Sequence, residues 1–168
     1  MTNLPDLNPA PGWAKVSGHA ILVPLTNGVP GENGVDRFLI AERIFRYGWA
    51  YDERDRELLG DCFTSNGIWE GDIMGTTAVG PFVGREAIVE FLTGFWSDQT
   101  DQRRHIFTNI VIDGLTSHEA TAHAYLLLTA SSDSMMTPVT TGPYRFELVK
   151  GDDSWRLQRL VGGFDAPF

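Results

Sequence analysis

The stretch that decides the fold spans residues 36–55 and reads DRFLIAERIFRYGWAYDERD. Its apolar residues recur every three or four positions, which predicts an amphipathic helix over about residues 36–51. An acidic step, Tyr51-Asp52-Glu53-Arg54-Asp55, comes next, and Asp55 is suited to cap a second, short helix. We therefore expect the Asp52 carboxylate to lie where the first helix ends.

A histidine, His105, stands where a later predicted strand begins. If the fold brings it to Asp52, the two form a carboxylate–imidazole pair, which transfers protons efficiently near neutral pH. The carboxylate would hold the ring in one tautomer and stabilise the imidazolium as it forms. Two plainer interpretations stay open. Asp52 could simply stop the helix or cap the next one, and His105 could face solvent.

The rest of the chain has a helical first part and a strand-rich second part. A short strand at 67–71, a loop at 72–80 and a third helix from Gly84 precede four segments typical of strands, at 103–113, 119–131, 138–150 and 154–162. Helices followed by antiparallel strands make an α+β arrangement. A sheet of this length has to curl over the helices, and the curl leaves a pocket between them.

Residues 1–33 differ in composition from the rest and predict an extended N-terminal arm, with one domain over residues 34–168. They hold five of the nine prolines, at positions 5, 9, 11, 24 and 30, which prevents a continuous helix. Residues 19–25 are apolar enough to dock on the domain or on a partner subunit. We expect His19 in the arm and His118 at a hairpin tip to lie at the surface, and Glu70 and Asp72 at a solvated edge.

Composition excludes several kinds of function. The chain has 168 residues with 42% hydrophobic content, enough for one domain with a core. A net charge of −9 without a dense Lys/Arg cluster argues against nucleic acid and anionic membranes as partners. Cys62, the only cysteine, rules out an internal disulfide and predicts a buried filler. The histidines lack metal-ligand spacing, so we expect no metal. No glycine-rich nucleotide or phosphate loop is present either, and we expect no cofactor.

Neither a signal peptide nor an apolar membrane span is visible, which favours a cytoplasmic protein. A single small domain rarely hides both faces of such a sheet, so we expect a homodimer or homotrimer.

Taken in order, several short motifs resemble the SnoaL-like branch of the nuclear transport factor 2-like superfamily. They are Tyr51 to Asp55, Leu59 to Phe63, Gly80 to Gly84, His105 to Asn109, the Asp113-Gly114 turn and the final Trp155-Arg156-Leu157. The resemblance covers about residues 35–164. It implies a cone-shaped, curved antiparallel sheet, an α+β barrel, wrapped on three N-terminal helices.

Within that branch the chain is similar to scytalone dehydratase and related lyases, and the resemblance implies a site. Asp52 and His105 match the catalytic pair of those enzymes, and Tyr51 matches a pocket tyrosine. Substrate contacts are expected from a further set: Tyr47, Trp69, Phe107, Asn109 and His123. Strand alternation puts Phe107, Asn109 and Val111 on the face of His105, but both faces are apolar and neither is favoured.

The facing of His123 depends on the preceding hairpin. A four-residue loop at 115–118 puts His123 on the face opposite His105, and a three-residue loop puts it on the same face. A second pocket histidine of scytalone dehydratase therefore has an undecided counterpart in this chain. The chain is also similar to hexachlorocyclohexane dehydrochlorinase, another enzyme of this branch. The basic residue that this enzyme carries late in its last strand would fall at Leu160, with Arg159 one position away.

The activity that this resemblance implies is a cofactor-independent lyase or isomerase, dehydratase-like, acting on a small hydrophobic, cyclic molecule. Two alternatives remain, because a fold does not fix a function. One is a non-catalytic ligand-binding module or accessory subunit, like the beta subunits of ring-hydroxylating dioxygenases, and the other is a polyketide cyclase.

Overall fold

The computed structural model describes residues 9–22, 34–152 and 154–168. Its helices are α1 (Trp13–Val16), α2 (Gly34–Asp52), α3 (Arg56–Asp61) and α4 (Arg85–Gly94), followed by a 3-10 turn, η1 (Phe95–Ser97). Its strands are β1 (Phe63–Ile73), β2 (Thr77–Val83), β3 (Gln102–Asp113), β4 (Glu119–Ser132), β5 (Met135–Lys150) and β6 (Trp155–Phe164). The predicted α+β class is confirmed.

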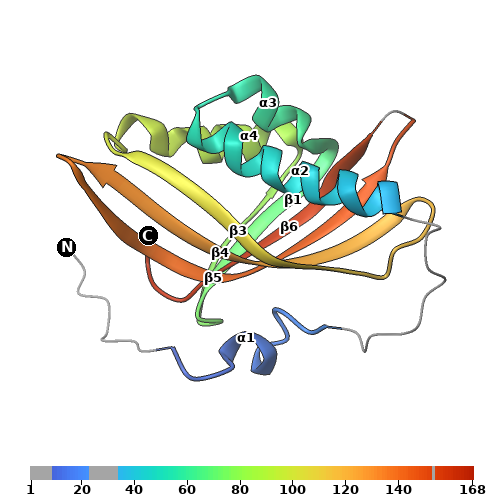
Figure 1. Cartoon of the computed structure of the whole chain (residues 1–168), viewed down its shortest axis with the longest axis horizontal. Helices are drawn as coiled ribbons and strands as arrows, with labels where there is room; N and C mark the ends of the chain where they lie inside the picture. The colour runs from blue at the N-terminus through green and yellow to red at the C-terminus, as the bar shows by residue number, and fades with distance from the viewer. Residues whose placement is uncertain (1–8, 23–33, 153) are drawn as a thin grey trace.

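The six strands form one curved sheet in the order β2-β1-β6-β5-β4-β3. Neighbouring strands are antiparallel except β1 and β6, which run parallel. Helices α2, α3 and α4 lie on the concave face of the sheet, and α1 lies below its convex face (Figure 1). The sheet is curved but open, so it forms half of the expected cone. The helices fill the hollow on its concave face.

The end of α2 and the start of α3 follow from local chemistry. Arg54 adopts a left-handed backbone with φ 56°, which ends the first helix. The side chain of Asp55 then accepts a hydrogen bond from the Leu58 backbone N–H at 2.9 Å and so caps α3, as the sequence predicts. Asp52 is therefore the last residue of α2, and its carboxylate lies at the end of the helix.

The core lies between the helices and the concave face of the sheet. Ile40 and Ile44 of α2 pack with Phe146 of β5 and Leu157 of β6, and all four are fully buried. Cys62 is also fully buried, in agreement with its predicted role as a filler. No helix among the described residues is both long enough and apolar enough to cross a membrane.

One predicted loop is wrong. Residues 72–80 were expected to be irregular, yet β1 continues to Ile73 and β2 begins at Thr77. The turn between them uses left-handed residues at Met74 and Gly75, with φ 55° and 69°. Strand β2 lies at the sheet edge and its side chains are largely exposed, so it lacks the buried alternation that identifies a strand in a sequence.

The predicted alternation along β3 is correct only as far as Phe107. A β-bulge between Thr108 and Val111 inserts one extra residue, and Asn109 in it has φ 53°. Beyond the bulge Ile110 and Ile112 pack against the core, and Val111 lies on the convex face. Asn109 and Val111 therefore do not share the face of His105, because periodicity in a sequence cannot register an extra residue.

Residues 9–22 lie against the convex face and are held there by polar side chains. The indole Nε1 of Trp13 donates to Asp165 at 2.7 Å, and His19 Nδ1 lies 2.6 Å from Asp72 Oδ2. His19 is only 7% exposed, so the expectation of a surface histidine is wrong, as is that of a solvated Asp72. Both predictions failed because the contact joins residues 53 positions apart. That residues 1–33 form an arm stays a prediction, since 1–8 and 23–33 lie outside the described residues.

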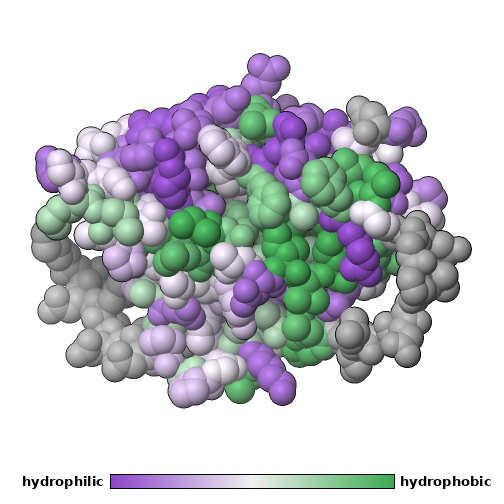
Figure 2. Space-filling model, in the orientation of Figure 1, coloured by the Kyte–Doolittle hydropathy of each residue, from purple (hydrophilic) through white to green (hydrophobic). Residues whose placement is uncertain are grey.

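Apolar side chains also remain on the outside of the molecule. Figure 2 shows hydrophobic groups gathered in the middle and right-hand parts of the face viewed, between hydrophilic regions. Helix α2 alone exposes Val35, Phe38, Phe45 and Trp49. The predicted homodimer or homotrimer stays a prediction.

The His19–Asp72 contact should hold residues 13–20 on the sheet. Asp72→Asn keeps the shape of the side chain and the hydrogen bond to Gly75 N–H, but it removes the charge that strengthens the bond to His19. We expect amide hydrogen exchange in residues 13–20 to become about tenfold faster, as for the loss of ~1.4 kcal/mol. Glu70→Gln, which breaks an ion pair with Arg159, is the control. Unchanged exchange in Asp72→Asn would show that the segment is held by other contacts.

Candidate active site

Asp52 and His105 meet at the junction of α2 and β3. The Nδ1 atom of His105 lies 2.6 Å from Asp52 Oδ1, and the backbone N–H of His105 donates to Asp52 Oδ2 at 2.7 Å. Both side chains are buried, with 7% of Asp52 and 8% of His105 exposed. One carboxylate therefore holds the ring and the main chain of the same residue, which fixes the ring in one orientation.

A glycine lets the helix come this close to the strand. A Cβ atom on Gly48 would lie 3.3 Å from both the Cβ and the carbonyl oxygen of His105. Glycine inside a helix costs about 1 kcal/mol relative to alanine. Here it permits the close approach of α2 that the Asp52–His105 contact requires.

The contact also decides which ring nitrogen is free. A carboxylate accepts hydrogen bonds, so Nδ1 carries the proton and Nε2 carries the lone pair. No described residue hydrogen-bonds Nε2. His105 lines a chamber between the helices and the sheet, so its unprotonated nitrogen is available to a molecule bound there.

The chamber is enclosed mainly by aromatic side chains. Its wall comprises Tyr47, Tyr51, Trp69, Phe91, Leu92, Phe95, Gln99, Arg103, His105, Leu128, Tyr144, Phe164 and Phe168. Tyr51 packs edge-on against the His105 ring with the ring centres 4.8 Å apart, and Phe107 lies behind it at 6.4 Å. Aromatic rings therefore pack against the imidazole, and the polar groups of the wall come from Gln99, Arg103 and the tyrosine hydroxyls.

Three tyrosines surround the imidazole and stay protonated. Burial raises the pKa of Tyr47, Tyr51 and Tyr144 above the usual value for a tyrosine. The Tyr51 hydroxyl donates to Gln99 Oε1 at 3.1 Å, and the Tyr47 hydroxyl accepts from Trp69 Nε1 at 3.2 Å. The hydroxyl protons of Tyr47 and Tyr144 have no acceptor among the described residues, so both can be donated to a ligand oxygen.

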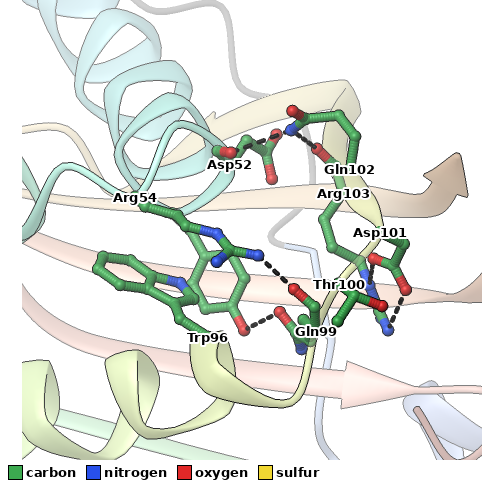
Figure 3. A pocket seen from close by; sticks show the side chains of 9 residues that line it. Asp52, Arg54, Trp96, Gln99, Thr100, Asp101, Gln102 and Arg103 are labelled. Atoms are coloured by element: carbon green, nitrogen blue, oxygen red, sulfur yellow. Dashed lines mark hydrogen bonds and ion pairs between the residues drawn. The ribbon is translucent and has the colours of Figure 1, made fainter. Parts of the chain in front are cut away.

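The chamber is small and opens towards a polar vestibule. Its volume of about 40 Å³ holds a few water molecules. The vestibule measures about 250 Å³ and shares Tyr51, Gln99 and Arg103 with the chamber. Figure 3 shows its polar wall, where Arg103 pairs with Asp101 and the Arg54 guanidinium donates to the Gln99 carbonyl. The indole N–H of Trp96, which also lines the vestibule, is buried without a partner among the described residues.

The structure brings most of the predicted site residues together and separates two of them. Asp52, His105, Tyr51, Tyr47 and Trp69 lie in or beside the chamber, with Phe107 packed against the imidazole. Asn109 and His123 lie on the convex face and line another cavity. For His123 the reason is register: His105 pairs with Leu128, as the four-residue loop predicts, so His123 points to the opposite side.

The sequence analysis missed other residues of the chamber wall, chiefly Tyr144, Arg103 and Gln99. For Tyr144 a signal existed, because it alternates with Phe146 and Leu148 on the buried face of β5. Gln99 lies in the turn before β3 and Arg103 lies at the start of that strand, and nothing in their spacing indicates a pocket. Within the described residues, no three His, Cys, Asp or Glu side chains converge as metal ligands.

An open curved sheet that holds an aromatic chamber against helices defines a protein of the nuclear transport factor 2-like, or cystatin-like, class of folds, which solved structures of that description match. A family model described as SnoaL-like domain matches residues 36–161. The chain belongs to this SnoaL-like family. No curated protein matches it at a significant level.

Three solved structures illustrate the similarity. A protein from Catenulispora acidiphila, in complex with S-DNPA, is 29% identical over 78% of this chain and 94% of that one, with a TM-score of 0.68. A candidate scytalone dehydratase from Novosphingobium aromaticivorans is 23% identical over 77% and 83%, with a TM-score of 0.63. The beta subunit of a candidate aromatic-ring-hydroxylating dioxygenase from the same organism is 15% identical over 80% and 92%, with a TM-score of 0.69. The last two show the shared fold alone.

The double hydrogen bond of Asp52 should contribute strongly to stability. In Asp52→Asn the single amide oxygen can accept from only one of the two His105 N–H groups, the ring or the backbone. The amide NH2 then faces the other N–H, which is also a donor. We expect the free energy of unfolding to fall by about 2–3 kcal/mol, as for bonds to a charged group. Glu53→Gln next to it, whose pair with Arg104 is half-exposed, should cost under about 1 kcal/mol. Equal losses in the two variants, measured by urea denaturation, would contradict the special role of Asp52.

The buried tyrosines predict a dependence of stability on alkaline pH. Unfolded tyrosines ionise near pH 10, whereas the raised pKa values keep those of the native chamber protonated, so the free energy of unfolding decreases above about pH 10. Tyr47→Phe removes one contribution and should make that decrease shallower. Tyr125→Phe, on the exposed outer face, is the matched control. If the slope in Tyr47→Phe equals that of the wild type, Tyr47 is not held protonated by burial.

Proposed function

We propose that this protein is a cofactor-independent lyase or isomerase, of the dehydratase kind, that acts on a small hydrophobic cyclic molecule. The observation that carries the proposal is the buried Asp52–His105 pair, whose free Nε2 faces an aromatic chamber. A binding module has no need of an oriented imidazole in such a place. Membership of the SnoaL-like family is compatible with this activity.

His105 would act first as base and then as acid. Its Nε2 takes a proton from the carbon beside a substrate carbonyl. The electron pair of the broken C–H bond is delocalised onto the carbonyl oxygen, which gives an enolate. When the enolate collapses, a carbon–carbon double bond forms and the neighbouring C–OH bond breaks. The imidazolium then returns its proton to the departing hydroxide, which leaves as water. Asp52 stays ionised throughout and stabilises the imidazolium.

The enolate oxygen needs a hydrogen-bond donor. Tyr47 and Tyr144 both line the chamber with unused hydroxyl protons, and their raised pKa values keep those protons in place. A fixed donor in an apolar site stabilises a developing oxyanion more than it would in water. Tyr51 already donates to Gln99, so its part is to hold the imidazole edge-on.

The shape of the site limits the substrate. Ligand pockets commonly measure roughly 300–1,000 Å³, far more than the 40 Å³ of the closed chamber. A ring can enter only if side chains at the mouth move. Phe95 and Phe168 line the chamber and are 37% and 46% exposed, so their rings are the ones free to swing outward. Aromatic walls then favour a flat, apolar ring.

A specific observation favours the main rival, a non-catalytic accessory subunit. The chamber is nearly filled by its own side chains, as expected of a protein whose hollow is only a core. A dioxygenase beta subunit has the same fold. Under this alternative the Asp52–His105 pair contributes to stability alone. The other alternative, a polyketide cyclase, would differ from the main proposal in its product.

Turnover separates these alternatives. The protein is screened against cyclic β-hydroxyketones, whose dehydration is followed by the absorbance of the conjugated product and by mass spectrometry. We expect His105→Ala to lower kcat by about 10²–10⁴, the usual contribution of general acid–base catalysis, and Asp52→Asn to lower it through the wrong tautomer.

His118→Ala, at an exposed position in the β3–β4 hairpin, is the control and should keep full activity. A substrate that is turned over equally by wild type, His105→Ala and Asp52→Asn would refute the mechanism. A ring-closed product of unchanged mass would point instead to a cyclase.

A further inference from the structure

We propose a second ligand site on the convex face of the sheet, for a small molecule with an apolar body and one acidic group. The cavity lies between residues 15–22 and strands β3, β4 and β5, on the side of the sheet where Figure 1 shows α1. Its volume is about 570 Å³, within the range of small-molecule sites. It is separated from the chamber of His105 by the sheet itself.

The walls of this convex cavity are largely apolar. Ala20, Ile21 and Leu22 form one side, and Val111, Ala124 and Pro143 belong to the strands opposite. Ile21 and Leu22 are 59% and 53% exposed, although the chain places them directly beside the sheet. A body of apolar atoms between the two walls would remove both from water, which is the main gain in binding.

Only a few polar side chains line the convex cavity among the apolar ones, as in most small-molecule sites. His123 lines the cavity, is 7% exposed, and its Nδ1 is buried without a hydrogen-bond partner among the described residues. An orphaned buried polar atom is costly, so a ligand that bonded Nδ1 after a turn of the His123 ring would gain from satisfying it. The amide of Asn109, in the β3 bulge, is also in the wall.

The charge of the side chains around the convex cavity favours a ligand with an acidic group. Burial lowers the pKa of His123, against the raising effect of Asp113 and with Arg145 and His19 lowering it further, so the ring is neutral near neutral pH. The cation at the cavity is then Lys15, an exposed side chain with no ion pair to any described residue. A carboxylate or sulfonate beside Lys15 would leave the apolar body between the walls.

The wall made by residues 15–22 is held in place independently of any ligand. His19 Nε2 is buried, and a Cβ on Gly163 would lie 2.8 Å from it, so this imidazole is packed onto the sheet backbone. Its Nδ1 is bonded to Asp72. His19 is therefore an anchor for the cavity wall, and it is not among the residues that line the cavity.

The test uses two fluorescent probes on the full chain, 1-anilinonaphthalene-8-sulfonate and its uncharged parent, N-phenyl-1-naphthylamine. We expect the wild type to bind both, with near-ultraviolet circular dichroism showing that the native state is kept. Val111→Trp places a large ring in the cavity, obstructs the apolar space between its walls and should raise both dissociation constants at least tenfold. Lys15→Gln should raise that of the sulfonate severalfold and leave that of the parent unchanged.

Two further variants keep the outcome decisive. Ile21→Glu lies outside the sheet, cannot unfold the core, and should weaken the sulfonate in the same way as Val111→Trp. His105→Ala removes a residue that does not line the convex cavity, so in protein shown to be native by circular dichroism it should change neither dissociation constant, and this test is independent of the proposed catalysis. The proposal is overturned if the wild type binds neither probe, if His105→Ala abolishes binding, or if Val111→Trp and Ile21→Glu bind like wild type. It is also overturned if sedimentation shows a second copy of the chain covering this face and excluding the probes.

Discussion

The structure depends on one carboxylate that binds two N–H groups of a single residue. Asp52 accepts from both the ring and the backbone of His105, and this contact ties the last residue of α2 to the first part of β3. Because both side chains are buried, neither can exchange its partner for water without a large cost. The distance between helix and sheet at this point is therefore set by a polar contact, and Gly48 supplies the room.

The same contact orders the chemistry of the chamber. A neutral imidazole in an apolar site has two tautomers, and the carboxylate leaves only the one with Nε2 free. The aromatic wall isolates that nitrogen and keeps the tyrosine hydroxyls protonated. The arrangement is prepared for proton transfer but is almost closed, so admission of a molecule and reaction with it are separate steps.

Local signals made much of this architecture predictable. The helical period of residues 36–51 and the cap at Asp55 predicted α2 and α3. The meeting of Asp52 with His105 was expected only from the family resemblance, because the local pattern left both side chains free to face solvent. The β2 edge strand was missed because an exposed strand buries nothing that could alternate. His19 and Asp72 were misplaced because their contact joins segments far apart in the chain. The orientation of Asn109 depends on one extra residue in β3, and the catalytic roles of Asp52 and His105 stay predictions.

That extra residue has a wider consequence. Before the bulge β3 directs alternate side chains such as Phe107 into the concave hollow, and after it the same phase of the strand points outward. One continuous strand thus serves two surfaces, with a break in phase between them. Substitutions in its first half can reshape the chamber of His105, while those in its second half can reshape the convex cavity. The two faces of the molecule can therefore diverge separately during evolution, although they share a single backbone.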